Sequence, residues 1–258
     1  ELMPYVNENF RTKGENLLFG WEYGGSFVFH MMMDQPTLFN AYLVASPFPI
    51  FDAIDDLDIS TNMETQLYFA VSPDEYDVRH STEKLNRKLT SNPIDGLDWK
   101  YFEFELEEHR STGYPTLYHG LRDYFKYYQE FETNNLQKFI NAGGMAYALN
   151  HAQERAKRHG FEPDLSLWSR FTIVRSAMRA DDFYHFETLL NSMDKDVFIK
   201  ELIAQRDYAV SQIATFYEKN NRFQEAVELY DLLLKKYPDS ESLLTKKKNA
   251  IQHLTKKQ

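Results

Sequence analysis

The first half of the chain alternates short apolar segments with longer segments of helical periodicity. Four apolar runs of strand length lie at residues 16–20, 41–45, 66–71 and 99–104. Between and after these runs, apolar side chains recur three and four positions apart, which predicts helices. The predicted helices cover residues 24–33, 77–89 and 114–128. Strands that alternate with helices predict an α/β domain with a parallel, doubly wound sheet.

The pattern changes near residue 130, after which only helical periodicity is found. The predicted helices cover residues 139–158, 165–179, 183–193, 197–218, 223–237 and 240–254. The first of these can break at Gly143 and Gly144, because glycine is a poor helix former. We therefore predict an α/β domain over residues 1–130 and an all-helical domain over residues 131–258.

The last helices contain one unit that is similar to a tetratricopeptide repeat. The unit spans residues 207–240 and closes with Pro238. Small alanines, Ala214 and Ala226, stand where its two helices would cross, and Tyr217 and Tyr230 follow at the expected spacing. A weaker copy begins about forty residues upstream. An ordinary antiparallel helix pair is the alternative. The repeat interpretation makes a protein or peptide partner possible through this helical domain.

Composition narrows the classes of function. The 258 residues are 43% hydrophobic, which is enough for sizeable cores, and the net charge of -10 argues against a nucleic-acid partner. The longest apolar run, residues 26–33, is too short to cross a bilayer, so no membrane span is predicted. The chain has no cysteine, which excludes disulfides, thiolate catalysis and cysteine-based metal sites. The cellular compartment stays open.

A glycine-rich turn between the first strand and the first long helix is the most informative motif. It reads Gly20-Trp21-Glu22-Tyr23-Gly24-Gly25. Glycines are expected there because a tight strand-to-helix turn leaves no room for side chains. The turn resembles the Gly-x-Ser-x-Gly nucleophile elbow of α/β-hydrolases. The flanking segments, residues 1–12 and 35–48, resemble those of esterases related to enterochelin esterase.

The resemblance implies an acid and a base further along the chain. The family places its acid on the loop after the third strand, which here makes Asp74 or Glu75 the candidate. Its histidine loop resembles residues 107–112, so that His109 would be the base. Trp21 and Tyr23, which flank the elbow tip, are candidate binding residues. The resemblance implies no cofactor and no metal.

The elbow departs from the family at its centre, because Glu22 stands where the family has serine. A serine alkoxide cannot form at this position. One interpretation is an impaired or inactive hydrolase in which Glu22 pairs with His109. The other is a carboxylate nucleophile, as in α/β-hydrolases that open epoxides with aspartate. Glutamate is one methylene longer, and a misplacement of roughly 1 Å can cost about a hundredfold in rate, so we favour the first interpretation.

The resemblance covers about residues 1–128, which correspond to the C-terminal half of an α/β-hydrolase. Strands that precede the elbow strand in the family are absent, and the chain begins at Glu1 rather than Met. We therefore expect the elbow strand to have an open edge and an upstream segment to be missing. The leading function is a hydrolase of ester bonds with an altered nucleophile, acting on a small ester-type ligand. The alternative is a non-catalytic binding protein that binds a ligand in the former active-site cleft and a protein partner through the helical domain.

Overall fold

The computed structural model describes residues 2–58 and 63–255. The chain divides into two compact units, Glu1–Lys126 and Tyr127–Gln258. Each unit has a hydrophobic core of its own. The first unit is mixed α/β and the second is helical throughout its described part.

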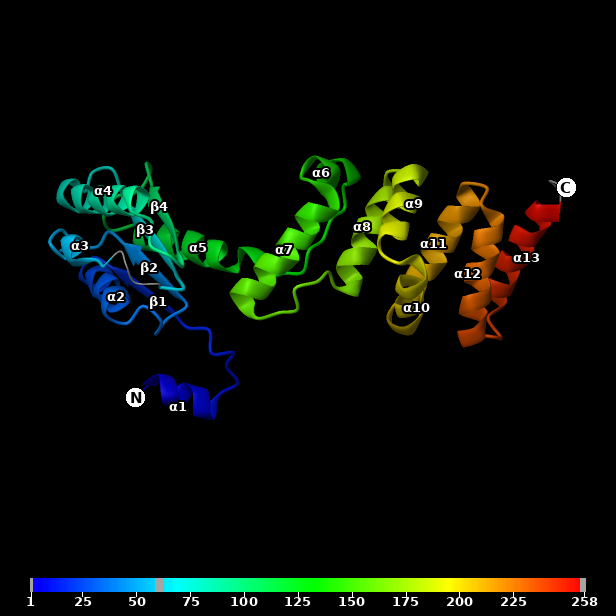
Figure 1. The fold of residues 1–258 in the computed structure, drawn as a ribbon, viewed down its shortest axis with the longest axis horizontal. Coiled ribbons are helices and arrows are strands. Elements are labelled where there is room, and N and C mark those ends of the chain that lie inside the picture. The colour runs from blue at the N-terminus through cyan, green and yellow to red at the C-terminus, as the bar shows by residue number, and fades with distance from the viewer. Residues whose placement is uncertain (1, 59–62, 256–258) are drawn as a thin grey trace. The chain divides into compact units, whose positions relative to one another are not determined.

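The first unit is built on a sheet of four parallel strands in the order β1-β2-β3-β4 (Figure 1). The strands are β1 (Leu17–Trp21), β2 (Ala41–Ala45), β3 (Thr65–Val71) and β4 (Leu97–Glu103). The four predicted strands are confirmed, each to within two residues of its predicted bounds. Among the described strands β1 pairs only with β2, so β1 forms one edge of this sheet.

Helices cover both faces of the sheet. The helices of the first unit are α1 (Leu2–Asn9), α2 (Tyr23–Asp34), α3 (Ala53–Asp56), α4 (Tyr76–Ser91) and α5 (Gly113–Tyr124), and a 3-10 turn (Phe125–Tyr127) crosses the boundary to the second unit. Side chains alternate between faces along a strand. Tyr42 and Val44 of β2 therefore pack in the cluster with α2 and α4, and Leu43 packs in the cluster with α5.

Helix α5 approaches the sheet unusually closely, and Gly120 makes this possible. A Cβ atom on Gly120 would lie 2.4 Å from Cδ2 of Leu43. Because that distance is well below van der Waals contact, any larger residue would require Leu43 to shift or α5 to move away from β2. This packing holds the middle of α5 against β2 and β3.

The second unit is a succession of helices joined by short turns (Figure 1). They are α6 (Leu136–Asn141), α7 (Gly144–His159), α8 (Leu167–Arg179), α9 (Phe183–Ser192), α10 (Lys195–Gln205), α11 (Asp207–Lys219), α12 (Phe223–Lys236) and α13 (Glu241–Thr255). The predicted break at the glycine pair is present, since Gly143 has φ 114° and separates α6 from α7.

The prediction of one helix over residues 197–218 is wrong. The segment forms two helices, α10 and α11, which are separated at Arg206 with φ -149° and ψ 54°. Asp207 begins α11, and its carboxylate accepts hydrogen bonds from Lys236, the last residue of α12, and from Tyr237, which follows it. Apolar spacing alone did not reveal the break because buried positions continue on both sides of it, at Leu202 and Ala209.

Helices α11 and α12 form a closely packed pair around small and aromatic residues. Ala214 and Ala226 are fully buried, and so are Tyr217 and Tyr230 to within 1%. This is the packing that the alanine and tyrosine spacing predicted for residues 207–240. The assignment of this pair to a tetratricopeptide repeat stays a prediction. None of the helices in the described ranges is both long enough and apolar enough to cross a membrane.

Candidate functional site

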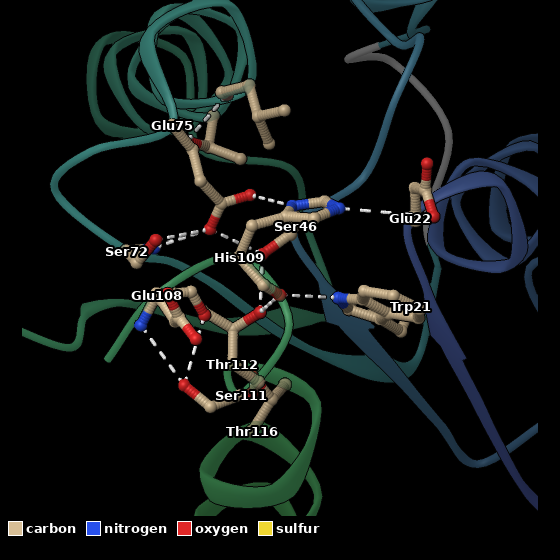
Figure 2. Close-up of polar contacts among 12 residues, drawn as sticks. Trp21, Glu22, Ser46, Ser72, Glu75, Glu108, His109, Ser111, Thr112 and Thr116 are labelled. Atoms are coloured by element: carbon tan, nitrogen blue, oxygen red, sulfur yellow. Dashed lines mark hydrogen bonds and ion pairs between the residues drawn. The ribbon is translucent and has the colours of Figure 1, made fainter.

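The candidate site lies at the carboxyl ends of the four strands, where parallel α/β folds place their ligands. Glu22 follows β1, Ser46 follows β2, and Ser72 and Glu75 follow β3. His109 lies on the loop between β4 and α5. Parallel strands bring residues from four distant parts of the sequence to one edge of the sheet (Figure 2).

Glu22 occupies the tip of the strand-to-helix turn in a strained backbone conformation. Its φ is 56° and its ψ is -120°, a region that residues other than glycine rarely adopt. Neighbouring backbone groups hold it there. Its N–H donates to the carbonyl of Ala45 at 3.0 Å, and its carbonyl accepts from the N–H groups of Ser26 and Phe48. Such strain is concentrated at functional sites, which makes Glu22 the first residue to consider.

The glycines around the elbow have different roles. A Cβ on Gly20 would lie 2.1 Å from the carbonyl oxygen of Gly24, and a Cβ on Gly25 would lie 2.9 Å from that of Ala45. Gly20 and Gly25 therefore allow α2 to start directly against β1 and β2. The expectation that Gly24 also lacks room is wrong, because no described atom outside its neighbours comes within 4 Å of a Cβ there.

His109 is held by Glu75. The Nδ1 atom of His109 lies 2.6 Å from Oε2 of Glu75, a carboxylate that is 4% exposed. Sequence reasoning left Asp74 and Glu75 as alternatives for this role. Asp74 is exposed, whereas Glu75 is buried and points to the imidazole (Figure 2). A carboxylate on Nδ1 fixes the ring and favours the tautomer whose Nε2 is free to accept a proton.

Hydroxyl groups surround the other oxygen of Glu75. Oε1 accepts from the Ser72 N–H at 2.9 Å, the Ser72 hydroxyl at 2.6 Å and the Ser46 hydroxyl at 2.8 Å. The Thr112 hydroxyl lies 2.6 Å from that of Ser46 and 2.9 Å from the carbonyl oxygen of His109. Its single proton is donated to one of these two oxygens. The network ties three loops to one carboxylate.

These contacts decide the protonation of Glu75. Burial alone would raise its pKa, but hydrogen bonds from His109, Ser72 and Ser46 to the carboxylate outweigh burial and hold the pKa below its ordinary value. Glu75 is therefore ionised at neutral pH, as an orienting carboxylate for His109 must be.

The opposite edge of the imidazole faces Glu22. Nε2 of His109 lies 3.9 Å from Oε2 of Glu22, and both side chains are 37% exposed (Figure 2). Trp21 holds the loop that carries His109. Its Nε1 donates to the His109 carbonyl at 2.9 Å, and its ring centroid lies 5.1 Å from the imidazole. The structure thus brings Trp21, Glu22, Glu75 and His109 together, and His109 stands between the two glutamates.

Tyr23 and Ser26 lie at the margin of the candidate site. Tyr23 is 65% exposed, and its ring meets that of Phe48 edge to face at 6.1 Å. Ser26 lies inside α2, and its hydroxyl donates to the carbonyl of Pro49 at 2.7 Å. The Ser26 hydroxyl is therefore engaged with backbone beside its own helix.

A cavity of about 440 Å³ opens beside these loops. Two of its lining residues are close in sequence to the site. Phe48 lies two residues after Ser46, and Tyr76 follows Glu75 at the start of α4. Phe51 and His80 stack on each other within it, with ring centroids 5.4 Å apart. The cavity is of the size and aromatic character that suit a small organic ligand. Within the described ranges, no group of three or more His, Asp or Glu side chains could hold a metal ion.

Sequence reasoning missed Ser46, Ser72 and Thr112. Each follows or precedes a predicted element, and small polar residues in such loops are common for reasons of turn chemistry alone. The one available signal was position, because Ser46 and Ser72 come directly after buried strands.

Comparison with solved structures identifies the fold. The structure is similar to that of an IroE-like serine hydrolase from Shewanella oneidensis, with a TM-score of 0.51 and 21% identity over 74% of this chain and 62% of that chain. The structure shares its fold with that hydrolase, and the likeness concerns the fold alone. It is also similar to an uncharacterised protein from Capnocytophaga ochracea, with a TM-score of 0.58 and 15% identity over 90% of this chain and 66% of that chain. The chain thus spans less than two thirds of the length of each of these two proteins. No protein-family model and no curated protein matches the sequence.

Proposed function

We propose that the first unit carries an esterase-type hydrolase site in which Glu22 occupies the nucleophile position, and that this replacement leaves the site impaired or inactive in ester hydrolysis. The observation that supports it is the placement of His109, with Nδ1 at 2.6 Å from Glu75 and Nε2 at 3.9 Å from Glu22. The order of the three groups along the imidazole supports an acid, a base and a nucleophile position of the kind used in acyl transfer.

The strained backbone of Glu22 supports the same proposal. A turn that holds its tip residue at φ 56° exposes that side chain above the strand ends, which a nucleophile needs. The N–H of Tyr23, the first residue of α2, lies in the helix's first turn, where N–H groups have no partner within the helix. In hydrolases of this fold the N–H after the nucleophile is one donor to the oxyanion.

A carboxylate at this position disables ordinary ester hydrolysis for a chemical reason. If Glu22 attacked an ester carbonyl, the tetrahedral intermediate would carry the Glu22 carboxylate and the phenolate or alkoxide of the ester as alternative leaving groups. The carboxylate leaves far more readily, since carboxylic acids have pKa values of about 4, phenols about 10 and alcohols higher still. The intermediate therefore returns to the ester, and no acyl group is transferred.

The test is hydrolysis of a panel of short-chain aryl esters and epoxides by the full chain, with Glu22→Ala and His109→Ala as controls. We expect no turnover above these two variants. We also expect Glu22→Ser to gain ester hydrolysis, and the further change His109→Ala to abolish that gain. The double variant separates a restored site from a nonspecific effect of removing a charge.

Two outcomes would contradict the proposal. Turnover by the unaltered chain that is lost in both Glu22→Ala and His109→Ala would establish a working carboxylate nucleophile. Failure of Glu22→Ser to hydrolyse any ester of the panel, with the fold intact, would mean that the elbow does not hold a nucleophile geometry.

A second candidate function is non-catalytic binding, and the cavity of about 440 Å³ favours it. Its aromatic wall can hold an aryl or acyl group without any bond being broken. Calorimetric titration with the carboxylic acid products of the ester panel distinguishes this function. Binding that survives in Glu22→Ala and is lost in Phe51→Ala, without turnover in any variant, would support the binding function.

A further inference from the structure

A second cavity, of about 530 Å³, lies entirely within the helical unit. Its walls come from α8, α11 and α13. Met178 and the nearly buried Phe216 supply an apolar floor. Four basic residues line the same cavity, and we call these the basic groove residues: Arg175, Arg179, Lys219 and Lys246.

The positive charge of this groove is mostly uncompensated. Of the basic groove residues, Lys219 pairs with Asp181 at 2.6 Å. Within the described ranges Arg179 and Lys246 form no ion pair, and Lys246 reaches only the Ser211 hydroxyl at 3.4 Å. This concentration of cations is unusual in a chain whose net charge is -10.

Arg175 lies close to a second cation, Arg179, and is packed among aromatic rings. Its guanidinium lies over the rings of Trp168 and Phe171, at 4.9 Å and 5.4 Å, and its buried Nε has no hydrogen-bond partner among the described residues. Burial and the nearby charge of Arg179 lower the pKa of Arg175. Holding two guanidinium groups near each other costs free energy that an anion in the groove would recover.

We propose that this groove binds an acidic peptide segment of a partner protein, with carboxylates on the basic groove residues and an apolar side chain on Met178 and Phe216. Two features favour a peptide over a small inorganic anion. Phosphate would leave the apolar floor exposed to water, whereas a leucine or phenylalanine between acidic residues would bury it. Gln212, which is exposed on the wall, offers an amide that can pair with peptide backbone.

The variant that tests this inference is Arg179→Gln with Lys246→Gln. Both residues line the groove and neither holds another element by an ion pair in the described part of the chain. The matched control is Lys200→Gln with Lys235→Gln, which removes the same charge from exposed positions outside the groove. Lys235 stands in the last turn of α12, as Arg179 does in the last turn of α8, so the loss of a favourable helix-dipole contact is matched.

The measurement is fluorescence anisotropy with labelled synthetic peptides in which glutamates flank a leucine at varied positions, together with matched peptides that lack the leucine. Lysine counterparts, polyphosphate and a single-stranded DNA oligonucleotide serve as competitors. We expect acidic peptides to bind, with an affinity that falls as salt rises. We expect the groove variant to weaken binding about tenfold and the control variant to change it less than about twofold, since each tenfold is about 1.4 kcal/mol.

Any of four results would overturn the inference. No acidic peptide of the set binds the folded chain, the control variant weakens binding as much as the groove variant, or peptides without leucine bind as well as those with it. Polyphosphate or DNA binding more tightly than every peptide would assign the groove to a different anion and overturn the peptide assignment. Circular dichroism of both variants establishes that the helices are intact.

Discussion

Gly20 at the end of β1 and Gly24 in the first turn of α2 meet so closely that a Cβ on Gly20 would lie 2.1 Å from the Gly24 carbonyl oxygen. The contact is between a side-chain position and backbone, so a rotamer change cannot relieve it. The approach places Glu22, midway between the two glycines, at the tip of the turn.

This relationship predicts different results for two similar substitutions. Gly20→Ala should destabilise the first unit by about 3 kcal/mol or more, because strand and helix must separate. Gly24→Ala should change stability by less than about 1 kcal/mol, since its Cβ meets open space and alanine favours the helix. Urea unfolding in a Trp168→Phe background measures this, because Trp21 and Trp99 then report the first unit alone. Equal losses in both variants would contradict the account of the elbow.

Glu22 stores backbone strain that glycine would release. At φ 56° and ψ -120° a residue with a Cβ costs about 1–3 kcal/mol, and glycine does not. Glu22→Gly should therefore be more stable than Glu22→Ala by about 1 kcal/mol, after the entropic cost of glycine is subtracted. Both variants lose the half-exposed contact with His109, so the comparison isolates the strain. Thermal unfolding of the two variants decides it, and an equal or lower midpoint for Glu22→Gly would refute it.

Glu75 should make the first unit sensitive to acid. Its pKa in the folded chain lies below its ordinary value of 4.5, so the unfolded chain binds its proton first. The stabilisation is complete above pH 4.5 and is lost as the pH falls through the lower, folded-state pKa. Glu75→Gln should lower stability at neutral pH and flatten its fall in acid. Urea midpoints between neutral and acidic pH test this, with Asp74→Asn as the neighbouring control that keeps Glu75.

Ser46 should help to set the pKa of Glu75. It supplies one of three donors to Oε1, at 2.8 Å, inside the protein. Ser46→Ala should raise the pKa of Glu75 and cost about 1–3 kcal/mol, as expected for a hydrogen bond to a buried charge. Ser26→Ala is the matched control, because it also removes a buried hydroxyl but one that bonds to the Pro49 carbonyl. Carboxyl NMR titration should show a shift for Glu75 in the first variant only.

Local sequence determined the elements of this protein. The strands and most helices follow from apolar periodicity, since a residue pattern acts over the few positions that form one element. Turn chemistry likewise located the elbow, because the close approach at Gly20 excludes every side chain. The resemblance to esterases pointed to Glu22 and His109, which lie where a known turn and a known loop are expected.

Only the tertiary structure decided which groups meet. Asp74 and Glu75 are adjacent and equally acidic, and sequence could not rank them. Folding buries Glu75 against His109, 34 positions away, and leaves Asp74 exposed. Ser46 and Thr112 are 66 positions apart and meet because parallel strands end at one edge of the sheet. Hydrogen bonds across such separations depend on packing between elements, and local periodicity carries no information about that packing.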